Sequence, residues 1–195
     1  FRGTEGPTTK GGRADWVGNA KLGLVEPQPG ASERVHDGFW AAYNDVKDQV
    51  EQALSELKVK SEKRPVLITG HSLGAALATL ATYSLVDKGV LTADQVATYT
   101  FGSPRCGDQA FADRYAELGL KDRTFRFINN NDAVTRVPLA RKRMQTTRWY
   151  AHVTDGIYLD SSGLPIERNH HAERWAHGLG GLRAPNPFDP GDDHY

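Results

Sequence analysis

Apolar residues recur at two different spacings along this chain, and together these spacings predict alternating helices and strands. Between residues 39 and 57 they fall three or four positions apart, which predicts an amphipathic helix. Short apolar or alternating runs at 66–68, 95–101 and 124–128 predict strands, whereas 73–85 and 111–120 predict helices. Such alternation is typical of an α/β fold with a mainly parallel sheet.

The remaining segments give weaker patterns. Residues 1–4 predict the end of a strand, and residues 5–35, rich in Gly, Pro and polar side chains, predict a functional loop or lid. Residues 149–153 and 156–159 predict a hairpin. From Asp160 onward the chain is polar and rich in His and Pro, with one short helix expected near Glu173.

Composition excludes several classes of protein. A chain of 195 residues is most simply one domain, spanning 1–195, and its 24 basic and 24 acidic side chains give no electrostatic footprint for nucleic acid. No apolar run reaches the length of a transmembrane segment, and the single cysteine excludes an internal disulfide. Because the chain begins at Phe1 and its only methionine is Met144, we expect a product trimmed at both ends from a longer protein.

Residues 70–74, Gly-His-Ser-Leu-Gly, fit the G-x-S-x-G pattern of a nucleophile elbow between a predicted strand and a predicted helix. In such a turn Ser72 adopts a strained backbone conformation that projects its hydroxyl above the sheet. The flanking glycines let strand and helix approach closely, and the Leu73 N–H can face a developing oxyanion. Since the pattern also occurs by chance, its strand-turn-helix context carries the prediction.

A serine nucleophile needs a histidine base and a carboxylate that fixes the tautomer of that histidine. Asp132 is the best candidate acid, because it ends a predicted strand at the edge of the sheet where Ser72 also lies. From spacing alone, a simple Asx-turn at Asp132 is an equal alternative. Asp108 and Asp113 are weaker candidates, on or before a short helix.

Chain order alone does not choose the base. The histidines after Asp132 are His152, His170, His171, His177 and His194. His152 lies in a predicted strand, where a structural role is favoured. His71 lies beside the nucleophile inside the elbow and cannot serve as its base without reversing direction.

The histidine-rich tail, with Asp192 and Asp193, also raises the possibility of a metal site. On one helix, however, His170 and His177 would lie about 10 Å apart, too far for one ion. The H-x-x-x-H spacing is absent as well. We therefore expect no metal.

Five sequence blocks occur in an order that resembles a known family. They are Phe-Arg-Gly-Thr at 1–4, His-Asp-Gly-Phe at 36–39, Gly-His-Ser-Leu-Gly at 70–74, Tyr-Thr-Phe-Gly-Ser-Pro-Arg at 99–105 and Asn-Asn-Asp-Ala-Val-Thr-Arg-Val-Pro at 130–138. The chain is similar to the class 3 lipases, the fungal-type triacylglycerol lipases and their bacterial relatives. This resemblance implies an α/β-hydrolase fold, with a mainly parallel central sheet flanked by helices and a lid-like loop, and no cofactor.

The resemblance also implies a role for individual positions. Ser72 matches the nucleophile and Asp132 the acid, while Thr4 and the Leu73 N–H match the oxyanion donors. The family's histidine matches His194 best, with His171 and His177 as alternatives. The segment around Trp16 and Val17 resembles the interfacial lid; otherwise Trp16 packs under the loop as core.

Three functional hypotheses follow. The first is a serine carboxylic-ester hydrolase, most simply a triacylglycerol lipase that acts on lipid, possibly at an oil–water interface. The second is a short-chain or hydroxycinnamoyl esterase with the same triad, which the polar lid favours. The third is a non-catalytic lipid-binding module on the same fold, since a fold alone does not confer activity. The intact elbow together with Thr4 and Asp132 argues against this module. The resemblance is compatible with secretion, and the sequence assigns no oligomeric state.

Overall fold

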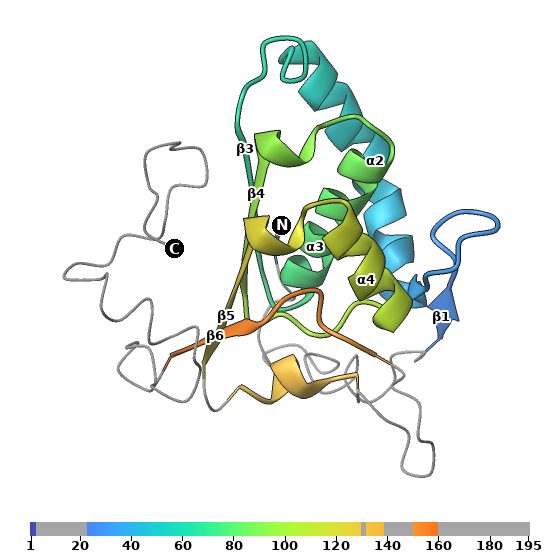
Figure 1. Ribbon diagram of the computed structural model, residues 1–195, viewed down its shortest axis with the longest axis vertical. Coiled ribbons are helices and arrows are strands. Elements are labelled where there is room, and N and C mark those ends of the chain that lie inside the picture. The colour runs from blue at the N-terminus through green and yellow to red at the C-terminus, as the bar shows by residue number, and fades with distance from the viewer. Residues whose placement is uncertain (3–22, 130–131, 139–149, 160–195) are drawn as a thin grey trace, which may run out of the picture.

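The computed structural model describes residues 1–2, 23–129, 132–138 and 150–159 (Figure 1). In chain order its helices and strands are β1 (Leu24–Val25), β2 (Val35–His36), α2 (Asp37–Glu56), β3 (Val66–His71), α3 (Leu73–Asp87), η1 (Ala93–Gln95), β4 (Val96–Phe101), α4 (Gln109–Glu117), η2 (Lys121–Arg123), β5 (Thr124–Asn129), η3 (Ala133–Arg136) and β6 (Gly156–Leu159). The three predicted helices and the three predicted strands between residues 39 and 128 are confirmed.

Strands β3, β4, β5 and β6 form a parallel sheet in that order, which confirms the predicted α/β class. Ile68 pairs with Thr98, and Thr98 in turn pairs with Thr124. Because all four strands run in the same direction, the chain leaves β3, β4 and β5 at one end of the sheet. The residues that follow these strands are thereby brought together.

The predicted hairpin at 149–159 is wrong. Residues 156–159 form β6, which pairs in parallel with β5 through Arg126 and Gly156. Ala151 forms only an isolated antiparallel bridge with Gly107. An alternating pattern describes a half-buried strand equally well in either pairing, so it cannot reveal the strand's partner.

The loop predicted at 5–35 contains structure that the sequence analysis missed. Within its described part, β1 pairs antiparallel with β2, matching Val25 to Val35. Both strands have only two residues, too short for a periodicity to be recognised.

Helices α2, α3 and α4 lie on one face of the sheet (Figure 1). Helix α3 packs against β3 and β4, and α2 packs on α3. Alanine, glycine and leucine make α3 apolar on nearly every side, as expected for a buried helix. Helix α2 instead buries Phe39 and Tyr43 and exposes its polar side, and it is capped by His36, whose Nδ1 accepts a hydrogen bond from the Phe39 N–H at 3.3 Å.

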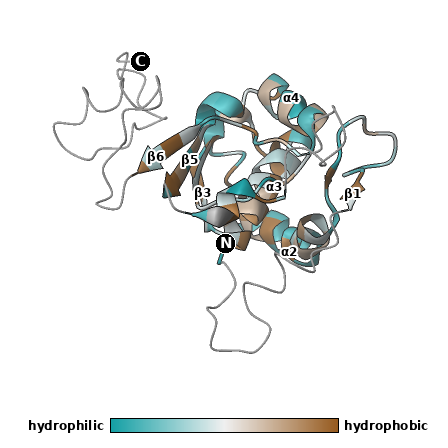
Figure 2. Ribbon diagram, turned by 90° about the horizontal axis from the view of Figure 1, so that it is seen from below, coloured by the Kyte–Doolittle hydropathy of each residue, from teal (hydrophilic) through white to brown (hydrophobic). Residues whose placement is uncertain are grey.

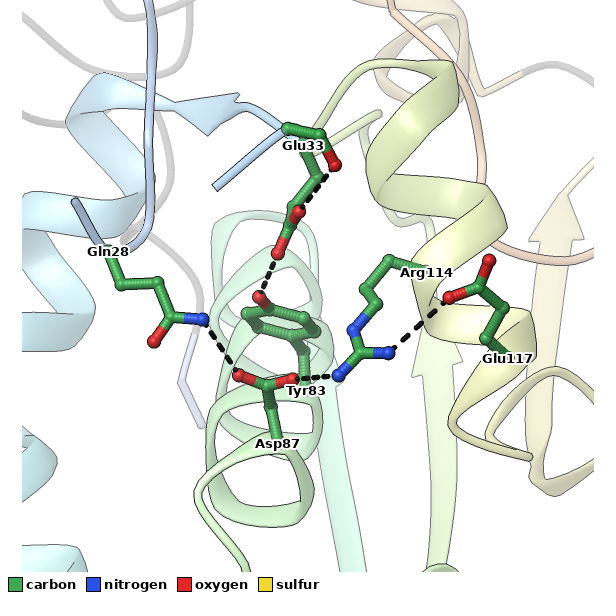
Figure 3. Close-up of polar contacts among 7 residues, drawn as sticks. Gln28, Glu33, Tyr83, Asp87, Arg114 and Glu117 are labelled. Atoms are coloured by element: carbon green, nitrogen blue, oxygen red, sulfur yellow. Dashed lines mark hydrogen bonds and ion pairs between the residues drawn. The ribbon is translucent and has the colours of Figure 1, made fainter. Parts of the chain in front are cut away.

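Polar side chains tie the segment before α2 to α3 and α4 (Figure 3). The Tyr83 hydroxyl donates to Glu33 Oε1 at 2.6 Å, and Gln28 donates to Asp87 at 3.3 Å. Arg114 of α4 reaches the same Asp87 carboxylate at 2.8 Å. Burial acts to raise the pKa of Glu33, but hydrogen bonds from Tyr83, its own backbone and Ser32 outweigh burial and lower it.

The other face of the sheet is apolar where no described helix covers it. Tyr99 stacks on Phe125 and Phe101 on Phe127, with ring centroids 4.9 and 5.2 Å apart. Leu67 remains 66% exposed on β3, and the hydropathy colouring shows apolar stretches on β5 and β6 (Figure 2). The described core therefore lies on the helical side, where two apolar clusters fill the space beneath α2, α3 and α4.

Candidate active site

The turn between β3 and α3 has the geometry of a nucleophile elbow. Ser72 has φ 56° and ψ −125°, a region that non-glycine residues rarely occupy. Its N–H donates to the Phe101 carbonyl at 2.9 Å, which links the turn to the end of β4. Ser72 is 2% exposed, and its Oγ has no hydrogen-bond partner within the described residues.

The two glycines of the motif allow backbone segments to touch. A Cβ at Gly70 would overlap the Gly74 carbonyl and lie 2.7 Å from the Ala75 nitrogen. A Cβ at Gly74 would overlap the Phe1 carbonyl and lie 2.7 Å from the carbonyl carbon of Arg2. The backbone of β3 therefore contacts that of α3, and the backbone of α3 contacts that of residues 1–2. Such close contact is possible because glycine has no side chain.

One expected oxyanion donor can be examined. Leu73 begins α3, so its N–H is among the first N–H groups of the helix, which have no intrahelical acceptor. The amino group of Phe1 donates to the Thr69 carbonyl at 2.6 Å, so the chain start lies along β3 near the elbow. The second expected donor, Thr4, lies outside the described residues.

Asp132 directly precedes η3, and its two carboxylate oxygens have different surroundings. Oδ1 accepts from the Val134 N–H at 2.9 Å, which is an Asx-turn. Oδ2 points to the turn after β4, because a Cβ at Gly102 would lie 2.6 Å from it and 3.8 Å from His71 Nε2. The Asx-turn and the approach to Gly102 therefore coexist: one oxygen caps the turn while the other lies against Gly102, in the turn after β4.

The alternative acids have structural contacts elsewhere. Asp108 caps α4 by accepting from the Phe111 N–H at 2.8 Å, and the same oxygen accepts from the Arg34 N–H at 3.2 Å. Asp113 is exposed and accepts from Gln109 at 2.8 Å on the outer side of α4. Both carboxylates thus form hydrogen bonds within α4, and that of Asp108 also binds the segment before β2.

His152 is the one histidine after Asp132 that falls within the described residues. Its Nε2 lies 2.9 Å from the Thr135 carbonyl, and burial, reinforced by the positive charge of Arg126, lowers its pKa to about 3. It is held in a structural contact, although outside any strand. The other candidates, His170, His171, His177 and His194, and the lid residues Trp16 and Val17, lie outside the described residues.

The contacts of Arg105 and His152 with the segment after Asp132 were missed in the sequence analysis. Arg105 ends the fourth resemblance block, but no residue pattern indicated what it binds. In the structure its guanidinium donates to the carbonyls of Arg136 and Pro138, at 2.5 and 2.8 Å.

A cavity of about 590 Å³ lies at the far end of the helical layer. Its lining includes Leu54, Lys58, Lys60 and Leu91. These residues lie at the C-terminal end of α2, in the segment that follows α2, and in the segment that follows α3. Since α3 is about 22 Å long and Ser72 precedes its first residue, we assign this cavity no role at the elbow.

No cluster of His, Cys, Asp or Glu suited to a metal ion occurs in the part of the chain that the structure describes. Across the same ranges, every helix is too short or too polar to span a bilayer.

Comparison with known proteins adds to this geometry. The sequence model of the family described as Lipase (class 3) matches residues 1–142. A secreted mono- and diacylglycerol lipase A from Penicillium cyclopium is 32% identical over 149 residues, covering 75% of this chain and 44% of the relative. A chloroplastic/mitochondrial phospholipase A1 from Oryza sativa subsp. indica is 32% identical over 161 residues, covering 71% and 35% respectively.

Among solved structures, the fold is similar to a triacylglycerol lipase whose catalytic centre is described as a serine protease triad. The TM-score is 0.65 at 26% identity, and the match covers 75% of this chain and 52% of that protein. The expected α/β-hydrolase fold is thereby confirmed. The chain spans about half, or less, of the length of these relatives.

Proposed function

This chain belongs to the class 3 lipase family, and from that premise we propose that it is a serine hydrolase that cleaves the ester bonds of acylglycerols. The observation that carries the proposal is the strained Ser72 between β3 and α3, with Oδ2 of Asp132 directed at the neighbouring turn. A lipid-binding module has no need of a serine held in this conformation.

The proposed mechanism follows the acyl-enzyme route. His194, oriented by Asp132, takes the proton of the Ser72 hydroxyl as the oxygen attacks the ester carbonyl. The Leu73 N–H and Thr4 donate to the oxyanion. The histidine then protonates the departing alcohol and activates water, which hydrolyses the acyl-enzyme and regenerates Ser72.

Two further parts of the proposal concern the substrate. The relatives include a mono- and diacylglycerol lipase and a phospholipase A1, so lipid esters are the class to test. Trp16 and Val17 are proposed as lid residues that contact lipid at an oil–water interface. A lid with this role moves when an interface offers its apolar side chains a partner.

The test is hydrolysis of p-nitrophenyl butyrate and palmitate by the whole chain. We expect Ser72→Ala to lose about 10⁴-fold in kcat or more, and Asp132→Asn to lose about 10³- to 10⁴-fold, because the histidine tautomer is no longer fixed. Asp108→Asn is the matched control and should keep most of the activity.

Each of the three hypotheses predicts a different result in these assays. Preference for palmitate, with activation above the solubility limit of the substrate, supports a lipase over a short-chain esterase. A wild-type chain that neither hydrolyses ester nor reacts with a fluorophosphonate at Ser72 favours the binding module. Full activity in Asp132→Asn, with loss in Asp108→Asn, would assign the acid to Asp108.

A further inference from the structure

Within the described residues, four successive carbonyl groups, at residues 135–138, accept hydrogen bonds from Arg105 and His152. The Arg105 guanidinium donates to the carbonyls of residues 136 and 138, and its backbone N–H donates to that of residue 137 at 2.9 Å. His152 contacts the carbonyl of residue 135. Residues 135–138 are therefore held by Arg105 and His152, which come from other parts of the chain.

Arg105 is well suited to this contact. It follows β4, in the turn that contains Gly102, so its backbone lies beside the segment that it binds. One guanidinium nitrogen, Nη1, reaches both Arg136 O and Pro138 O. Because arginine stays charged at every working pH, both are charge-assisted hydrogen bonds, about twice as strong as neutral ones.

His152 contributes through one defined tautomer. A carbonyl can only accept, so the 2.9 Å contact with Thr135 requires that Nε2 carry the hydrogen. Burial and the charge of Arg126 keep the pKa of His152 at about 3, so the ring is neutral near pH 7. The imidazole therefore stays a fixed donor and does not titrate under assay conditions.

The contacts reach Asp132 through the turn itself. Thr135 Oγ1 donates to the Asp132 carbonyl at 2.8 Å, and the Val137 N–H donates to the Val134 carbonyl at 3.2 Å. The Val134 N–H in turn holds Asp132 Oδ1. A shift of residues 135–138 would therefore move the carboxylate away from Gly102.

We propose that Arg105 and His152 are positioning residues, which fix the turn at 132–138 so that the Asp132 carboxylate stays against Gly102, next to the residue that binds the Ser72 N–H. The inference rests on the proposed function only for the role of Asp132 as the catalytic acid. The hold on the turn is a property of the fold and can be measured without any substrate.

The experiment combines amide hydrogen exchange with kinetics in the whole chain. Arg105→Met and His152→Leu remove the side-chain donors, whereas Arg105→Lys and His152→Gln retain one in each case. We expect exchange at the Val134 and Val137 amides to accelerate at least about 10-fold in the first pair, with α3 unchanged. We expect kcat on p-nitrophenyl butyrate to fall about 30- to 100-fold in Arg105→Met, with KM within twofold, and to recover in part in Arg105→Lys.

The matched control is Arg123→Met. Arg123 also donates to a backbone carbonyl, that of Asp94 at 3.2 Å, but at the opposite end of β5. It should change neither the exchange of the turn nor kcat. An equal loss of kcat in this control would mean that the Arg105 effect is general destabilisation.

The outcomes separate the two proposals. Unchanged exchange at Val134 and Val137 in Arg105→Met and His152→Leu overturns the positioning inference, whatever the activity. Faster exchange with unchanged kcat, in a chain whose hydrolysis depends on Ser72, also overturns it. A wild-type chain without Ser72-dependent hydrolysis refutes the proposed function, while exchange still decides whether the two residues hold the turn.

Discussion

The elbow at Ser72 and the turn at Asp132 follow β3 and β5, on either side of β4 at the same edge of the sheet, yet they are held by different means. At the elbow, backbone packs against backbone, through glycines within two residues of Ser72. At the turn, side chains from distant positions bind carbonyl groups, with sequence separations of 31 residues for Arg105 to Arg136 and 17 for His152 to Thr135.

The contrast shows two ways of fixing a side chain of the proposed active site. A backbone contact leaves no room for adjustment, so a single methyl group is enough to disrupt it. A side-chain contact tolerates small displacements but depends on charge, tautomer and hydrogen-bond geometry. We therefore expect substitutions that add side-chain volume to disrupt the elbow. The turn at Asp132 should respond instead to the loss of a charge or hydrogen-bond donor, and to pH.

The largest effect should come from Gly70→Ala. The added Cβ would overlap the backbone of residues 74–75, which cannot rotate away, so β3 and α3 must separate. We expect a loss of about 3 kcal/mol or more in the free energy of unfolding, measured by urea denaturation.

The control for this variant is Gly23→Ala, where, among the described residues, a Cβ meets Asp37 Cβ at 3.6 Å and Asp37 Oδ2 at 3.8 Å. It should change stability by less than about 1 kcal/mol. Equal stability of the two variants would mean that the close approach at the elbow is absent in solution.

An intermediate effect is expected from Gly102→Ala, and it should fall on activity. The new Cβ would lie 2.6 Å from Asp132 Oδ2, a side-chain atom that can move, so the carboxylate is displaced while the fold survives. We expect kcat to fall about 100-fold, because misplacement by about 1 Å has effects of that size.

Gly89→Ala separates clash from backbone strain. Gly89 has φ +65°, close to the +60° of Gly102, but nothing lies within 4 Å of a Cβ there. Both variants should lose about 1–2 kcal/mol from the left-handed backbone conformation, and only Gly102→Ala should lose activity. Comparable activity in the two would exclude a displaced carboxylate.

The smallest expected effect is a pH dependence of stability from His152. Its folded pKa of about 3 lies below the ordinary 6.5, so between these values the unfolded chain binds a proton that the folded chain excludes. Stability should therefore fall as pH drops from 6.5 towards 3, by at most about 1.4 kcal/mol per pH unit.

Urea denaturation of the wild type and His152→Gln at pH 7 and pH 5 measures this contribution. The glutamine keeps a donor for Thr135 but does not titrate, so the variant should lose less stability on acidification, by about 2 kcal/mol or less. Parallel losses in the two proteins would show that His152 binds a proton as readily in the folded state.

The difference between the two regions also explains what the sequence could predict. The elbow was predicted because strand, turn and helix are continuous in the chain and their periodicities are local. The mainly parallel sheet was predicted from the alternation of strands and helices along the chain. Asp132 was predicted as the acid from its place after a strand, and that role stays a prediction. The sequence could not show what the alternatives Asp108 and Asp113 contact, whereas the structure gives each of them a hydrogen bond on α4.

What the sequence could not provide depends on long-range pairing. Nothing local indicates that residues 156–159 pair in parallel with β5, or that Arg105 binds the segment after Asp132. Strands β1 and β2 are too short to produce a period. The roles of Thr4, Trp16, Val17 and His194 stay predictions, since these residues lie outside the described ranges.

The single cysteine has a practical consequence. Cys106 follows Arg105 directly, is 3% exposed, and has its pKa raised to about 12 by burial. The thiolate, not the thiol, is the form that attacks an alkylating reagent, so in the native state this sulfur should be almost inert. The rate at which iodoacetamide labels Cys106 would then measure how often the surrounding core opens. Cys106 is therefore an intrinsic probe of local unfolding in this part of the molecule.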